Sequence, residues 1–257
     1  ESEHKVVAVI TAPDRRSGRG KKLTPSPIKV FSQQHGLLVL QPPNLKDPAL
    51  ISQLRELAPD VMVVVAFRML PKEVWSIPPN GTFNLHASLL PKYRGAAPIH
   101  WAIINGEHQT GVTTFFINEQ IDTGEIITQK SLSIGLGENT GQLSNRLEEL
   151  GATLTLETLD LIATNRVNSS PQPKNNQASL APKLTRENTQ LQWDQEGQSI
   201  ERKVRGLQPF PNAWTKLSNN DQLLYCKIHD VNFIDRKQAL EDGKVFVENQ
   251  QIMVSVP

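Results

Sequence analysis

The sequence contains one cysteine, Cys226, in 257 residues. A single thiol excludes an internal disulfide framework and any CxxC metal or redox site, since each requires a second cysteine. The sequence also lacks an apolar run that approaches the roughly 18 residues of a membrane span. Its first residues, ESEHKVV, have neither the basic nor the apolar region of a signal peptide. These absences lead us to expect a cytoplasmic protein without a membrane segment.

An excess of charge of either sign is missing too, because the formal net charge is only +1. A uniformly basic coat for nucleic acid is therefore excluded, and a polyanion would have to be bound by a local patch. One such patch carries five cations within eight residues, beside Gly18 and Gly20: Arg15, Arg16, Arg19, Lys21 and Lys22. On charge alone, this segment is either a phosphate-binding loop or an ordinary solvated one.

Short β-branched runs alternate with helical patterns in the first part of the chain. The runs cover residues 6–10, 37–40 and 61–67. Continuous apolar runs of this length are typical of strands buried on both faces of a parallel sheet. The helices between them begin with a capping residue followed by proline, Ser26 with Pro27 and Asp47 with Pro48. This βαβαβ order predicts an α/β fold with a Rossmann-like, mostly parallel sheet.

The rest of the chain predicts a second, smaller domain. Residues 167–188 are rich in Asn, Ser, Pro and Lys and poor in large apolar side chains, which is typical of a linker. Short strands are predicted beyond it, over residues 213–217, 223–228, 244–248 and 252–256. We therefore expect an α/β domain over residues 1–166, a linker over 167–188 and a small β-barrel-like (OB-like) domain over 189–257.

The stretch FNLHASLLPKYRG, from Phe83 to Gly95, contains the residues best suited to chemistry. Asn84 and His86 lie two residues apart where a strand is expected to end, so both point to the same face. An imidazole exchanges protons near neutral pH, and an amide can donate a hydrogen bond to an oxygen that becomes negative. The pair therefore suits acyl transfer, with Asp122 of the motif IDTG as a candidate to orient the imidazole.

Other interpretations of these residues stay open at this level. His86, Asn84 and Asp122 can each be structural, as a satisfied strand-end residue or a turn former. Ser88 would complete a hydrolase triad, but the GxSxG elbow is missing and Ser88 follows its supposed base by two residues. HxH and HExxH metal spacings are missing, and so are the glycine fingerprints of dinucleotide and phosphate loops.

Several stretches resemble the signature of the folate-dependent formyltransferases. They are FNLHASLLPKYRGAAPIHWAI (residues 83–103), TGVT (110–113) and IDTGEI (121–126). Within that family, PDRRSGRGKKLTPSPIK, RGAAP and LQWDQEGQSIERKVRGLQPFPNAW resemble the members that formylate methionyl-tRNA. The likeness extends over nearly the whole chain.

The resemblance implies transfer of the formyl group of 10-formyltetrahydrofolate to the α-amino group of initiator methionyl-tRNA, without a metal. It places the family's catalytic residues on Asn84, His86 and Asp122. Its SLLP motif, which implies contact with tetrahydrofolate, falls on Ser88, Leu89, Leu90 and Pro91. Its basic loop, which implies contact with the acceptor arm of the tRNA, falls on Arg19, Lys21 and Lys22.

Two other functions remain compatible with the sequence. One is formyl transfer to a small amine, either a ribosylamine or an amino sugar nucleotide, and the other is a non-catalytic tRNA-binding module. Because the family pattern starts before residue 6 and continues beyond residue 257, we expect the family's first strand and the end of its second domain to be missing from this sequence. We also expect a monomer.

Overall fold

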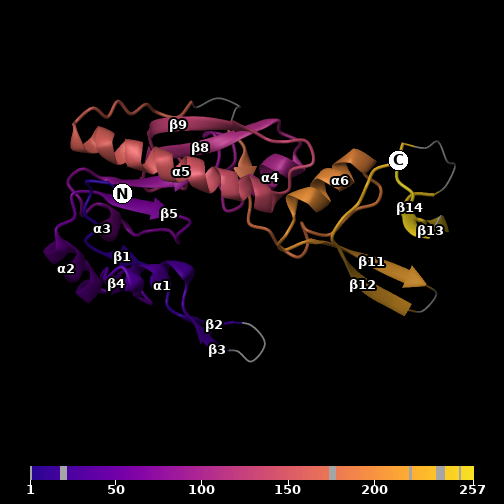
Figure 1. The fold of residues 1–257 in the computed structure, drawn as a ribbon, viewed down its shortest axis with the longest axis horizontal. Coiled ribbons are helices and arrows are strands. Elements are labelled where there is room, and N and C mark those ends of the chain that lie inside the picture. The colour runs from indigo at the N-terminus through magenta and orange to yellow at the C-terminus, as the bar shows by residue number, and fades with distance from the viewer. Residues whose placement is uncertain (1, 18–21, 174–177, 220–221, 236–240, 249) are drawn as a thin grey trace. The chain divides into compact units, whose positions relative to one another are not determined.

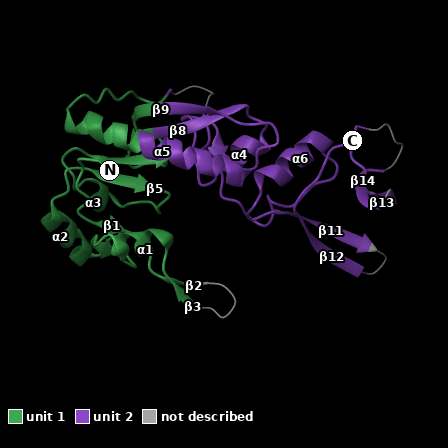
Figure 2. Ribbon diagram, in the orientation of Figure 1, with its two compact units in different colours: residues 1–86, 114–128, 154–172 green, residues 87–113, 129–153, 173–257 purple. Residues whose placement is uncertain are grey.

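The computed structural model describes residues 2–17, 22–173, 178–219, 222–235, 241–248 and 250–257. The chain divides into two compact units that interleave along the sequence (Figure 2). Unit 1 comprises residues 1–86, 114–128 and 154–172, and unit 2 comprises residues 87–113, 129–153 and 173–257. The domain limits drawn from the sequence at residues 166 and 188 stay a prediction.

Unit 1 contains the predicted succession of strands and helices (Figure 1). Its elements are β1 (Val9–Ile10), α1 (Pro27–Gln34), β4 (Val39–Leu40), α2 (Pro48–Leu57), β5 (Met62–Val65), α3 (Lys72–Trp75) and β6 (Thr82–His86). Strand β1 pairs in parallel with β4, and β5 pairs in parallel with β6. The α/β class and the parallel pairing are therefore confirmed, although β1 is shorter than the predicted run of residues 6–10.

The strands β8 (Gln109–Phe116) and β9 (Ile126–Ser133) complete a four-stranded sheet in the order β5-β6-β8-β9. The Phe116 N–H donates to Glu125 O at 2.9 Å, and the Ile134 N–H donates to His108 O at 2.9 Å. The end of β8 is thus bonded to the start of β9, and the start of β8 to the end of β9, so the two strands form an antiparallel hairpin. The β8–β9 hairpin therefore extends the sheet beyond β6. Antiparallel neighbours can be joined by a short loop, whereas parallel neighbours need a longer crossover connection.

The two predicted helix starts are confirmed. The Ser26 hydroxyl accepts from the Lys29 N–H at 3.2 Å, and the Asp47 carboxylate accepts from the Ala49 N–H at 2.9 Å. Each cap satisfies a backbone donor that the first helical turn would otherwise leave free, and a proline occupies the position where no such donor is needed.

Two apolar clusters hold unit 1 together. Side chains from β4, α2, α3 and the loop before α2 form the first, namely Leu40, Leu45, Leu50, Leu54 and Val74. The second joins β6, β9 and helix α5 (Thr140–Ala163) through Phe83, Ile127 and Ile162. Burial of each large side chain contributes roughly 1.5–3 kcal/mol. The second cluster fixes β6, the strand that carries the candidate catalytic pair.

The basic segment near the N-terminus differs from the prediction of a loop. Its two sides form an antiparallel hairpin, with β2 (Arg15–Ser17) paired to β3 (Lys22–Thr24). The hairpin extends away from the rest of unit 1 near α1 (Figure 1). Arg19 and Lys21 lie outside the described residues. Three consecutive residues of β2 pair with three of β3, which composition alone did not indicate.

Unit 2 contains helices α4 (Pro98–Ile104) and α6 (Gly197–Gly206) and the start of α5. Its described strands after α6 form two separate antiparallel pairs: β11 (Ala213–Asn219) with β12 (Gln222–Ile228), and β13 (Val245–Glu248) with β14 (Gln251–Val254). The described residues of this region do not close into a barrel, so the OB-like barrel is not confirmed. No helix among the described residues is long and apolar enough to cross a membrane.

A parallel pair anchors the loop after β6 within unit 2. Strand β7 (Arg94–Gly95) pairs with β10 (Leu180–Ala181), which lies in the segment that composition assigned to the linker. Beside it, Tyr93 is 5% exposed and its hydroxyl donates to Glu107 Oε1 at 2.9 Å. Burial raises the pKa of Tyr93 to about 12; the bond from Asn105 opposes the increase and the Glu107 carboxylate adds to it.

This burial predicts that Tyr93 destabilises the fold at alkaline pH. The folded-state pKa of about 12 exceeds the ordinary value of 10.0, so the unfolded chain loses its proton first and stability falls as pH rises from 10 to 12. Tyr93→Phe should remove the phenolate ultraviolet absorbance that appears near pH 12 after a rapid pH jump, and should flatten this stability loss. With only two tyrosines in the chain, an unchanged late ionisation in the variant would contradict the assignment.

Candidate active site

Strand β6 places the candidate pair on one face. Phe83 is completely buried on the opposite face, in the cluster with Ile127 and Ile162. Since side chains alternate along a strand, Asn84 and His86 point away from that cluster together. Neighbouring strand β5 fixes the register through the parallel pair Val64 and Asn84. A slip of one residue would turn both polar side chains into the apolar cluster, so burial of Phe83 specifies their direction.

The imidazole of His86 lies between an aromatic ring and a carboxylate. Its ring contacts Phe115 edge to face, with 6.5 Å between centroids and 83° between the planes. His86 Nδ1 lies 3.8 Å from Asp122 Oδ2. The structure therefore brings together two residues that are 36 positions apart in the chain, as the candidate constellation requires. The side chains are 7% and 16% exposed, so water screens their interaction poorly when the imidazole is protonated.

The distance of 3.8 Å exceeds that of a direct N–H···O bond, roughly 2.7–3.2 Å. Catalytic hydrogen bonds in proteins without substrate are often this long and shorten in the reacting complex. The half-buried Asn84 makes no side-chain hydrogen bond to any residue in the described part of the chain. Its amide donors therefore remain available for a bound molecule.

A tight turn presents Asp122 to the imidazole of His86. The Asn118 side-chain oxygen organises this turn by accepting from the Gln120 N–H at 2.9 Å and from the Thr123 hydroxyl at 3.0 Å. Asp122 itself adopts the left-handed conformation, with φ of +52°. Non-glycine residues rarely adopt this conformation, and aspartate is among the few that tolerate it.

Gly124 allows the turn to lie against the end of β8. A Cβ atom at this position would lie 1.6 Å from the backbone oxygen of Phe116, which is far inside contact distance. Any side chain here would push the turn away from β8, and the Asp122 carboxylate away from His86. The glycine of the IDTG motif is therefore required by the packing of the turn.

The segment from Ser88 to Pro91 belongs to unit 2 and is tightly held. Ser88 is completely buried, and its hydroxyl donates to Lys92 O at 2.6 Å. A serine in this state is a poor nucleophile, which argues against the hydrolase triad. Leu90 and Pro91 are buried and joined by a cis peptide bond, and Leu89 is half-buried.

Two polar side chains brace this segment within unit 2. The Thr113 hydroxyl donates to Ser88 O at 2.6 Å and accepts from the Leu90 N–H at 3.2 Å. The Gln129 side-chain amide donates to Leu90 O at 3.0 Å and to Thr113 Oγ1 at 2.8 Å. Neither residue was predicted to belong to the site: Gln129 carries no local functional signal, and Thr113 stands out only as the last residue of the TGVT stretch.

Of the predicted tRNA contacts, only Lys22 lies in the described residues, exposed on β3. It is paired opposite Ser17, on the hairpin face that also carries the exposed Arg15. Arg16 points to the other face. The described side of the hairpin therefore offers two cations in the same direction.

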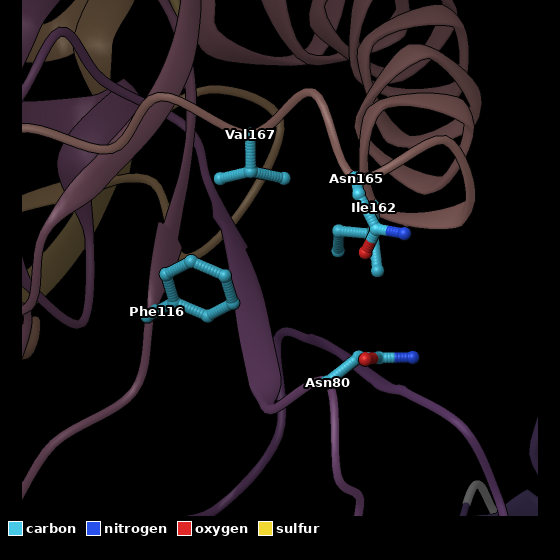
Figure 3. A pocket seen from close by; sticks show the side chains of 5 residues that line it. All are labelled: Asn80, Phe116, Ile162, Asn165 and Val167. Atoms are coloured by element: carbon cyan, nitrogen blue, oxygen red, sulfur yellow. The ribbon is translucent and has the colours of Figure 1, made fainter.

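Unit 1 also contains a shallow hollow of about 230 Å³ away from these residues (Figure 3). Its lining side chains are Asn80, Phe116, Ile162, Asn165 and Val167. None of them belongs to the candidate constellation, and Asn80 precedes the start of β6 whereas His86 ends it. Within the described ranges, no group of three or more His, Cys, Asp or Glu side chains could hold a metal ion.

Comparison with known proteins decides the family. The formyl transferase family model matches residues 1–159, and the model of the formyl transferase C-terminal domain matches residues 183–256. This chain belongs to the formyltransferase family. The methionyl-tRNA formyltransferase of Flavobacterium johnsoniae is 44% identical to this formyltransferase over 256 residues, which cover 100% of this chain and 81% of the relative.

Solved structures share the fold of this formyltransferase at lower identity. A sugar N-formyltransferase from a Shewanella species has a TM-score of 0.61 at 22% identity, over 82% of each chain. HypX from Aquifex aeolicus, solved with tetrahydrofolic acid, has a TM-score of 0.58 at 23% identity, over 72% of this chain and 32% of that one.

Proposed function

We propose that this formyltransferase transfers the formyl group of 10-formyltetrahydrofolate to the α-amino group of methionyl-initiator tRNA, which supplies formylated initiator for translation. The observation that carries the choice of acceptor is the 44% identity to the methionyl-tRNA formyltransferase of Flavobacterium johnsoniae across the whole chain. The geometry of unit 1 supports the chemistry independently, because it gathers an amide, an imidazole and a carboxylate.

Asn84 and His86 stabilise charge in this mechanism. The methionine amine attacks the formyl carbon of the bound folate to give a tetrahedral adduct, which collapses as the bond from that carbon to the folate nitrogen breaks. The free Asn84 amide donates to the formyl oxygen as that oxygen becomes negative, and the protonated imidazole of His86 donates from the same strand face. Donors fixed by strand β6 need no reorganisation when the charge develops, so they stabilise the transition state more than the ground state.

Asp122 faces the imidazole of His86. At 3.8 Å from Nδ1 and largely screened from water, its carboxylate holds the ring in one orientation and offsets the positive charge that the ring carries during the reaction. His86 gives its proton to the leaving folate nitrogen and, once neutral, accepts the proton that the attacking amine loses, so the net reaction moves one proton from the amine to the folate. The catalytic residues of the proposal are therefore Asn84, His86 and Asp122.

The segment from Ser88 to Pro91 has the apolar side chains and the fixed backbone that a binding site for the folate needs. Leu89 offers a half-buried apolar side chain between neighbours that are buried, and Thr113 with Gln129 keeps the backbone in place. Flat aromatic ligands bind to apolar surfaces with a few fixed polar groups. The tetrahydrofolic acid bound to HypX, whose fold is similar, is consistent with this assignment.

The basic hairpin suits the phosphates of the tRNA. Lys22 and Arg15 extend from one face of the hairpin, and the predicted contacts Arg19 and Lys21 lie between its two strands in the sequence, outside the described residues. Each neutralised phosphate adds to the salt dependence of binding. In this proposal the strands β11 to β14 belong to a barrel-like module that supplies further tRNA contacts.

A comparison of acceptors tests the proposed function. The purified protein with 10-formyltetrahydrofolate should formylate methionyl-tRNA, and should leave glycinamide ribonucleotide and an amino sugar nucleotide unmodified. Formylated product on a small amine alone would contradict the proposal. Tight tRNA binding without product on any acceptor would favour a non-catalytic binding module.

Substitution of the strand pair tests the mechanism. Asn84→Ala should lower turnover roughly 100- to 1,000-fold, and His86→Ala roughly 100- to 10,000-fold, with thermal unfolding close to that of the parent. His108→Ala, which removes an exposed imidazole, is the matched control and should keep parental turnover. Rates within a few-fold of the parent for His86→Ala would reject its catalytic role.

A further inference from the structure

We propose that Gln172 positions Asp122, and through it His86, for formyl transfer. The inference rests on the proposed function, because it extends the role assigned there to Asp122. Gln172 lies in the segment after α5, fifty residues from Asp122 in the sequence. Its bonds go to main-chain oxygens of the turn, so Gln172 is a positioning residue that acts on the backbone.

The side-chain amide of Gln172 holds the turn at two points. Its nitrogen donates to Asp122 O and to Gly124 O, each at 2.9 Å. An amide NH₂ group has two N–H donors, and both are used on main-chain oxygens two residues apart, those of Asp122 and Gly124. Gln172 is only 7% exposed, so water cannot readily replace these bonds.

The turn needs such a brace because its conformation is costly. Asp122 has φ of +52°, and Gly124 lies so close to Phe116 O that a Cβ would overlap it. Backbone held in a sparsely populated region persists only where its surroundings determine it. The two carbonyls bonded to Gln172 flank Thr123, so the amide clamps the short arc of backbone from which the Asp122 side chain projects.

The segment that carries Gln172 is itself bonded to the start of β9, the second strand of the β8–β9 hairpin. The Ser170 N–H donates to Ile126 O at 2.9 Å, and the Ile126 N–H donates to Ser170 O at 2.8 Å. The Ser169 hydroxyl donates to Glu125 Oε2 at 2.6 Å. These contacts hold the segment in place independently of Gln172. Removal of the Gln172 amide should therefore release the Asp122 turn while the segment stays bonded to β9.

Gln172→Met tests the inference, since methionine keeps the length of the side chain and removes both donors. Turnover at saturating methionyl-tRNA and 10-formyltetrahydrofolate should fall roughly 10- to 100-fold, because small displacements of catalytic groups have effects of this size. The KM values should change little. In an Asp122→Ala background the same substitution should have no further effect on turnover.

Gln41→Met is the matched control. Gln41 also donates two bonds from its side-chain nitrogen, to Ala12 O at 2.7 Å and to Asp14 Oδ1 at 2.9 Å, away from the Asp122 turn. Both variants should lower the melting temperature, and only Gln172→Met should lower turnover per folded molecule. If Gln172→Met does not fold, Gln172→Asn replaces it, because it adds no charge and keeps an amide that is one methylene too short to reach both main-chain oxygens.

The outcomes separate this inference from the proposed function. Parental protein that does not formylate methionyl-tRNA would overturn the proposed function and the inference with it. Active parental protein whose turnover is unaffected by Gln172→Met would overturn the inference alone. So would an equal proportional loss in the parental and Asp122→Ala backgrounds, since Gln172 would then act independently of Asp122.

Discussion

The alternation of side chains along strand β6 is the constraint on which the site depends. Burial of Phe83 on one face obliges Asn84 and His86 to share the other, and the parallel pairing with β5 prevents a slip in register. The apolar core therefore does more than stabilise unit 1. It sets the direction of the two groups that the proposed reaction needs, so packing and chemistry are determined by the same strand.

The carboxylate reaches this pair by a different route. Asp122 lies on a left-handed turn that needs Gly124 for close approach to β8, and the turn costs conformational energy that the surrounding contacts must offset. Gln172 supplies two of those contacts from a distant part of the chain. A regular strand thus carries two of the three groups and a strained turn carries the third.

The predictable part of this structure is the part set by local pattern. A capping residue followed by proline predicted the start of both helices, and the alternation of side chains along a strand predicted that Asn84 and His86 share a face. Contacts between distant segments had no such signal. The strand β10 lies within a stretch with the composition of a linker, and Gln172 lies in the same stretch although it bonds to the Asp122 turn. The antiparallel sides of the basic hairpin were also missed, because charge and glycine content describe a loop equally well.

In the proposed mechanism, Asp122 acts on the reaction only through His86. A double-mutant cycle of His86→Ala and Asp122→Ala, followed by turnover in methionyl-tRNA formylation, measures this coupling most directly. The double variant should be no slower than His86→Ala alone, because a carboxylate without its imidazole has nothing left to support. A double variant slowed by the product of the two separate losses would contradict this mechanism.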